Sequence, residues 1–200
     1  MQRRQISQTV GIGTRALLAL FLAGVPQAFA DLSPLCVSSN HRYLQDVSGH
    51  PFFLVGDCPQ NLPIKLAIPE LDAYMADCQS KGFNLLWICI DGQRTPSPTT
   101  NPPRDRSGAL MMTNGWHIGS LNAAYFVTID AIVNKAQEHG IYCMFTPLSE
   151  CQWTQRNINQ NSPAEWYNYG KFLGSRYKGK ANIIWQLGND TINETPCPTP

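Results

Sequence analysis

Four acidic residues lie just beyond the ends of four predicted strands: Asp57, Asp91, Glu150 and Asp190. In a barrel of parallel strands, side chains at the strands' carboxyl ends gather on one face. Two carboxyl groups about 5–5.5 Å apart can cleave a glycosidic bond with retention, one protonating the leaving oxygen and the other attacking as nucleophile. The spacing therefore predicts carboxylate acid/base chemistry at one rim of the molecule.

The four acids differ in how the sequence supports them. Asp190 is the candidate catalytic residue, and its alternative is an aspartate that caps a turn. Asp57 is a candidate for binding sugar hydroxyls or orienting another carboxylate, and its alternative is turn formation with Gly56. Asp91 and Glu150 are candidate substrate contacts, and the alternative is that both are ordinary solvated loop residues.

Tryptophans supply the aromatic surface that a carbohydrate site needs, because sugars stack their C–H faces on indole rings. Trp116 and Trp153 are flanked by polar residues in long loops, so we expect them to bind substrate. Trp87 and Trp185 lie within apolar runs, and we interpret them as core residues.

No pattern in the chain indicates a metal site or a cofactor. The four histidines are scattered without His-Glu-x-x-His spacing, and no Cys-x-x-Cys occurs, so we expect neither metal nor cofactor. Without the basic leader the charge balance is 12 basic to 14 acidic residues (Lys+Arg 15 minus Arg3, Arg4 and Arg15), a net −2 with no basic run. This argues against nucleic-acid binding. The sequence carries no signal for an oligomeric state.

Strands and helices alternate along the chain. Continuous apolar runs predict strands covered on both faces, and helical spacing of apolar residues predicts the helices between them. The predicted strands are Phe52–Val55, Leu85–Ile90, Ile141–Phe145 and Ile183–Leu187. The predicted helices are Pro69–Lys81, Tyr125–His139 and one opened by the capping box from Ser162 to Glu165. Short pieces at Leu35–Val37 and Tyr43–Gln45 suggest a preceding hairpin.

This order predicts an α/β fold with parallel strands joined by right-handed crossovers. Two architectures fit: a small open sheet with helices on both faces, or the first half of a (β/α)8 barrel, which typically needs about 250 residues. The segment from Asp91 to Asn122 is rich in Pro, Thr, Ser and Gly, and a loop of that length is usually functional or disordered.

The first thirty residues read as a signal peptide. Three arginines precede an apolar run from Ala16 to Val25, and Ala28-Phe29-Ala30 has the form of a cleavage site. We expect cleavage after Ala30, a secreted or periplasmic protein, and no membrane association after cleavage, because no apolar stretch is long enough to span a bilayer. All seven cysteines follow the leader, which allows up to three disulfides.

Several segments together resemble the catalytic domain of the apiosidase-like glycoside hydrolases, over about residues 35–190. They are Tyr43-Leu44, Gly49 to Asp57, Lys81 to Asn84, Asn122 to Phe126, Phe172 to Tyr177 and Asn182 to Asp190. The resemblance implies an exported TIM-barrel enzyme that hydrolyses O-glycosidic bonds in polysaccharide. It also implies that Asp190, in Gly188-Asn189-Asp190, is the acid/base, and that the nucleophile is a Glu on a later strand.

The chain departs from the family pattern in three places. Cys58-Pro59 stands where the family usually has Thr, and Asn189 replaces a usual Gly. The residues from Thr191 to Pro200 do not resemble the family's continuation. We therefore expect residues 31–200 to form a partial TIM barrel, truncated after the fourth strand and inactive alone. The alternative is a non-catalytic exported protein, either a carbohydrate-binding remnant or an inactive fragment with no stable fold.

Overall fold

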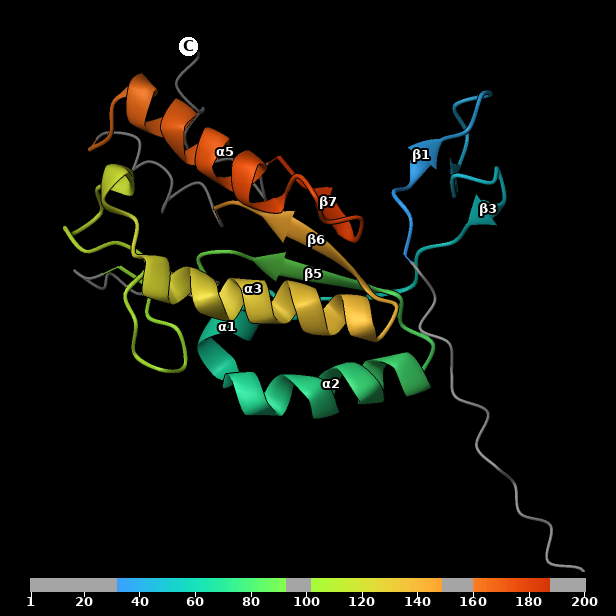
Figure 1. The fold of residues 1–200 in the computed structure, drawn as a ribbon, viewed down its shortest axis with the longest axis horizontal. Helices are drawn as coiled ribbons and strands as arrows, with labels where there is room; N and C mark the ends of the chain where they lie inside the picture. The colour runs from blue at the N-terminus through green and yellow to red at the C-terminus, as the bar shows by residue number, and fades with distance from the viewer. Residues whose placement is uncertain (1–31, 93–101, 149–159, 188–200) are drawn as a thin grey trace, which may run out of the picture.

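Four parallel strands in the order β4-β5-β6-β7 form the main sheet of the computed structural model, which describes residues 32–92, 102–148 and 160–187 (Figure 1). The strands are β4 (Gly56–Asp57), β5 (Leu85–Cys89), β6 (Tyr142–Thr146) and β7 (Ile183–Trp185). Leu86 pairs with Asp57 on one side and with Cys143 on the other, so the three strands are in register at this level. The parallel order predicted from the alternating pattern is confirmed.

Local sequence signals, such as capping residues, determine where the helices between the strands begin. They are α1 (Leu62–Lys65), α2 (Ile68–Ser80), α3 (Ala123–Glu138) and α5 (Pro163–Tyr177), with a 3-10 turn η1 (Ile118–Ser120) before α3. The capping box at α5 forms as predicted: the hydroxyl of Ser162 accepts from the backbone N–H of Glu165, whose carboxylate accepts from the N–H of Ser162. None of the helices in the described ranges is long and apolar enough to cross a membrane.

The three longer helices cover one face of the sheet. Leu86, Ile88 and Phe145 belong to the same buried apolar cluster as residues of α2, α3 and α5. Side chains of adjacent residues in a strand point to opposite faces, so Trp87, Met144 and Thr146 lie on the other face. We call this the inner face, because a barrel wall carries its helices outside. One-sided helices favour the barrel half over the open sheet with helices on both faces.

A small antiparallel sheet lies at the amino-terminal end of the main strands (Figure 1). It consists of β1 (Cys36–Val37), β2 (Leu44–Gln45) and β3 (Pro51–Phe52). The ring of Phe52 packs edge-on against that of Tyr142 of β6, with 5.3 Å between the ring centroids. The Tyr142 hydroxyl donates to the carbonyl of Ser33 at 2.6 Å. The small sheet therefore covers the amino ends of the strands and leaves their carboxyl ends to the loops.

The first main strand begins later than the sequence predicted. Phe52 lies in β3, and the parallel strand starts only at Gly56. The side chain of Asn84 explains the gap: its Nδ2 donates to the carbonyl of Phe53 at 2.9 Å, and its Oδ1 accepts from the N–H of Val55 at 2.8 Å. These side-chain bonds replace the backbone ladder where the chain passes from one sheet to the other.

The long segment before α3 is packed, not loose, over its described part, residues 102–122. Met111, Met112 and Ile118 are at most 1% exposed and belong to the core. Asp105, 5% exposed, accepts a hydrogen bond from the Thr128 hydroxyl of α3 at 2.6 Å. The apolar residues of the segment thus extend the core past the carboxyl end of β5.

Candidate active site at the carboxyl ends of the strands

Two of the predicted site residues lie where described parallel strands end. Asp57 is the last residue of β4 and Asp91 follows β5 by two positions. Glu150, Trp153 and Asp190 lie outside the described residues, so the roles predicted for them stay predictions. The described part of the rim comprises Asp57, Asp91, the loop that carries Trp116, and the ends of β6 and β7.

Asp57 lies on the side of the sheet that the helices cover. It is the register partner of Leu86, a core residue, and the Tyr74 hydroxyl of α2 donates to its Oδ2 at 3.0 Å. Its Oδ1 accepts from the backbone N–H of the next residue, Cys58, at 2.8 Å. Burial, followed by smaller contributions that include Asp57, raises the pKa of Tyr74, so the phenol stays protonated as the donor. The substrate-binding role of Asp57 stays a prediction.

Asp91 is buried, with 0% of its surface exposed. Burial raises the pKa of Tyr125 and of Tyr169, and the negative charge of Asp91 raises both further, which places its carboxylate near the two phenols. The alternative of a solvated loop residue is therefore wrong. Contact between Asp91 and a substrate would require the surrounding segments to open, and that role also stays a prediction.

Trp116 packs inward from the loop that precedes α3. It is 9% exposed and belongs to the core cluster. The side chain of Asn161 holds this loop, since its Nδ2 donates to the Trp116 carbonyl at 2.9 Å and its Oδ1 accepts from the N–H of Ile118 at 2.8 Å. In this arrangement little of the indole is available to stack on a sugar, so its predicted substrate contact depends on movement of the loop.

Three polar side chains that the sequence did not single out as a group form a row across the inner face. The indole Nε1 of Trp87 donates to Oγ1 of Thr146 at 2.8 Å, and this hydroxyl donates to Oε1 of Gln186 at 3.3 Å. The N–H of Gln186 also donates to the Phe145 carbonyl at 2.9 Å, which continues the strand pairing beyond β7. The row joins β5, β6 and the residue after β7 near their carboxyl ends. Trp87 lies in a continuous apolar run, so no sequence signal indicates that it belongs to this row.

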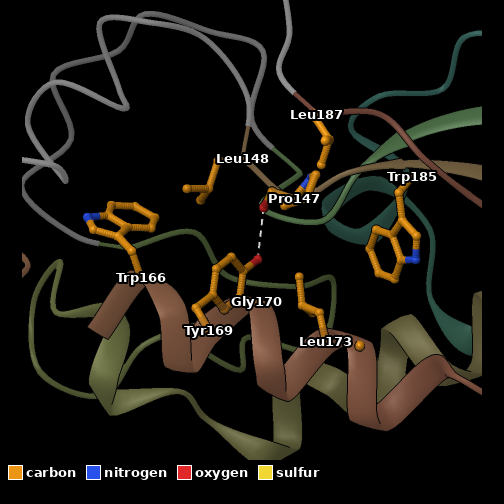
Figure 2. A pocket seen from close by; sticks show the side chains of 9 residues that line it. Pro147, Leu148, Trp166, Tyr169, Gly170, Leu173, Trp185 and Leu187 are labelled. Atoms are coloured by element: carbon orange, nitrogen blue, oxygen red, sulfur yellow. Dashed lines mark hydrogen bonds between the residues drawn. The ribbon is translucent and has the colours of Figure 1, made fainter. Parts of the chain in front are cut away.

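An apolar groove of about 330 Å³ lies on the helix side of β6 and β7 (Figure 2). Its walls include Trp166 and Leu173 of α5, and Trp185 and Leu187 at the end of β7. The Tyr169 hydroxyl, which Figure 2 shows at the groove, already donates to the Pro147 carbonyl at 2.8 Å. None of the described residues that line the groove carries a charge.

No metal site is evident in the described ranges, where no three His, Cys, Asp or Glu side chains are grouped so as to hold an ion. The thiols of Cys36, Cys78 and Cys143 are not in disulfides. Burial raises the pKa of Cys143 to about 12, so this thiol is neutral and unreactive at physiological pH. The polar chemistry of the described rim therefore belongs to its carboxylates and to the row on the inner face.

Solved structures of glycoside hydrolases share this fold. A glycoside hydrolase family 5 protein from Bacteroides vulgatus is 28% identical, with a TM-score of 0.67, and the match covers 78% of this chain and 33% of that one. A second glycoside hydrolase is 28% identical, with a TM-score of 0.65, and the match covers 79% of this chain and 34% of that one. An endo-1,4-beta-mannanase from Rhizomucor miehei, at 16% identity, shares the fold with a TM-score of 0.53, and the match covers 82% of this chain and 51% of that one.

The chain thus spans about a third of the length of the first two of these proteins. Among curated proteins, none matches the sequence. The family described as apiosidase-like, catalytic domain, matches residues 38–196, which include all the predicted site residues. This match agrees with the resemblance in the sequence segments and with the parallel sheet, and it extends six residues beyond Asp190, into the segment that we expected to depart from the family. The chain therefore belongs to the apiosidase-like catalytic domain family.

Proposed function

We propose that the protein is an exported glycoside hydrolase that cleaves O-glycosidic bonds in polysaccharide with Asp190 as its acid/base. The observation that carries the proposal is the family match over residues 38–196 together with a parallel sheet like that of solved glycoside hydrolases. Export rests on the sequence pattern that ends at Ala30. Because the chain spans about a third of the solved enzymes, the activity of the whole protein is part of the proposal.

The reaction assigns two roles to carboxyl groups. Asp190 follows the last residue of β7 by five positions in the sequence, and the family resemblance gives it the acid/base role. Its protonated carboxyl would donate to the leaving oxygen while a second carboxylate attacks the anomeric carbon, forming a covalent intermediate. Asp190, now ionised, would then take a proton from the water that hydrolyses this intermediate.

The described residues do not supply the second carboxylate. Asp57 is held on the helix side by Tyr74, and Asp91 is buried. The resemblance implies that the nucleophile is a glutamate on a later strand. We therefore expect this 200-residue chain alone to hydrolyse no glycoside. The same observation favours a second candidate function, carbohydrate binding without hydrolysis, for which the neutral row on the inner face is suited.

Turnover assays on aryl glycosides and pectic oligosaccharides test the proposal. The chain alone should be inactive although it unfolds cooperatively in a thermal melt. A chimera in which residues 38–196 replace the matching third of the Bacteroides vulgatus protein should regain turnover, and Asp190→Asn should abolish it, because the amide cannot donate the catalytic proton.

Asp77→Asn on the exposed surface of α2 is the matched control and should leave the chimera active. Activity of the chimera that survives Asp190→Asn would contradict the role of Asp190. Turnover by the 200-residue chain alone, lost in Asp190→Asn, would show that the second carboxylate lies within these residues. Glycan binding without turnover in the chimera would favour the second candidate function.

A further inference from the structure

The row on the inner face has a fixed direction of hydrogen bonding. An indole N–H can only donate, so Oγ1 of Thr146 must be the acceptor of the bond from Trp87. The hydroxyl has a single proton, and it points to Oε1 of Gln186. Thr146 is 0% exposed, so water does not compete for this hydroxyl. The chain of two bonds therefore sets which way the Gln186 amide faces.

With its oxygen held by Thr146, the Gln186 amide presents both hydrogens of Nε2 away from the row. Within the described residues no acceptor binds this nitrogen. Gln186 is only partly buried, so water binds this nitrogen in the free protein and a ligand oxygen can replace that water. The orientation of this side chain is fixed, and its donors have no protein partner among the described residues. At the carboxyl end of a strand, such a side chain is suited to bind a ligand oxygen.

We propose that Gln186 is a substrate-contacting residue whose side-chain amide donates a hydrogen bond to a hydroxyl oxygen of the bound sugar. Thr146 and Trp87 are then positioning residues that act through Gln186. The inference rests on the proposed function and extends it, since Gln186 precedes Asp190 by four positions in the sequence. A neutral amide suits a sugar hydroxyl, which carries no charge.

The hydrogen-bond chain itself can be tested without a ligand. In NMR spectra of the full chain, the indole proton of Trp87 should exchange slowly with solvent. Thr146→Val, which keeps the shape but removes the hydroxyl, should speed this exchange about tenfold and shift the side-chain amide signals of Gln186. Thr146→Ser should preserve both. Identical spectra in the two variants would overturn the assignment of the row.

Binding of p-nitrophenyl apioside and of a pectic oligosaccharide digest then tests the role of Gln186. Gln186→Met keeps the length of the side chain and should weaken binding about fivefold to tenfold, as expected for one lost hydrogen bond. Thr146→Val should weaken it about threefold, and Thr146→Ser should not. Gln137→Ala on α3, away from the inner face, is the control and should bind as the unchanged chain does.

The double variant separates positioning from a general structural effect. If Thr146 acts through Gln186, Thr146→Val should weaken binding no further once Gln186→Met is present. Additive losses would overturn the positioning role, and unchanged binding by Gln186→Met would overturn the contact. If the unchanged chain binds neither probe, the proposed function fails as well, whereas the first two outcomes leave it standing.

Discussion

Replacing Asp105 should release the loop that packs over the carboxyl end of β5. Its Oδ1 accepts from the Ser107 N–H at 2.9 Å, the Ser107 hydroxyl at 2.7 Å and the Ala109 N–H at 2.9 Å, and its Oδ2 accepts from the Thr128 hydroxyl at 2.6 Å. Only the last bond reaches another element, α3. Asp105 therefore both folds the turn and ties it to the helix beneath.

The magnitude follows from these four bonds. Each bond contributes about 1 kcal/mol net. After the substitution, donors near the surface can hydrogen-bond to water instead. The Thr128 hydroxyl, which is 4% exposed, loses its partner. Asp105→Ala should thus lower the free energy of unfolding by about 3 kcal/mol and Tm by roughly 6–12 °C. Asp105→Asn keeps the three bonds to Oδ1 and should cost only about 1 kcal/mol.

The effect should depend on pH in a defined direction. Burial alone would raise the pKa of Asp105, but hydrogen bonds from Thr128, Ser107 and Ala109 outweigh it and hold the pKa below its ordinary value. The stabilisation is therefore fully present above the unfolded-state pKa of about 3.9 and is lost as the pH falls through the lower folded-state pKa. The difference between Asp105→Asn and the unchanged chain should shrink below about pH 4.

Urea unfolding at pH 7 and pH 3, followed by tryptophan fluorescence, measures both effects. Asp77→Asn, which breaks an exposed pair with Lys81, is the control and should change stability by less than about 0.5 kcal/mol. A loss below about 1 kcal/mol for Asp105→Ala at pH 7 would refute the anchoring role.

Three further predictions concern other parts of the chain. Ser162→Ala removes the side-chain cap of α5 and should cost about 1 kcal/mol in a thermal melt, and no change would contradict the capping box. Burial raises the pKa of the Cys143 thiol to about 12, so iodoacetamide at pH 8 should label exposed Cys36 and spare Cys143 in the native protein; equal labelling by mass spectrometry would count against this. The hydrogen bond to His139 lowers the pKa of Asp72. The stability that Asp72 contributes is therefore present above about pH 3.9 and is lost as the pH falls through its folded-state pKa. Asp72→Asn should therefore reduce the acid-side loss of stability in urea melts, and an unchanged pH profile would argue against the pair.

The elements with strong apolar patterns could be predicted to within one or two residues. The helix predicted over Tyr125–His139 is α3 at Ala123–Glu138, and the strand predicted over Leu85–Ile90 is β5 at Leu85–Cys89. Burial explains this success, because a strand covered on both faces must be apolar throughout and a helix must repeat its apolar stripe. The first strand was misplaced because two residues are too few to carry a pattern.

The described part of the site was harder to predict, because it depends on which face each side chain occupies. Within a continuous apolar run nothing in the sequence distinguishes Trp87 on the inner face from Ile88 in the helix-side core. Asp57 and Asp91 were placed correctly at strand ends, but the contact with Tyr74 and the burial of Asp91 arise from helices distant in sequence. Trp116 looked exposed because its neighbours are polar, and tertiary packing decided otherwise.

The central claim is that sugars are bound at the carboxyl ends of the parallel strands. An NMR titration of the full chain with a pectic oligosaccharide digest tests it directly, with backbone amides as reporters. We expect shifts at Gly92, Leu148 and Leu187, which follow β5, β6 and β7, and none at Val37 or Leu44 of the small sheet. Shifts confined to the small sheet at the amino ends would contradict it.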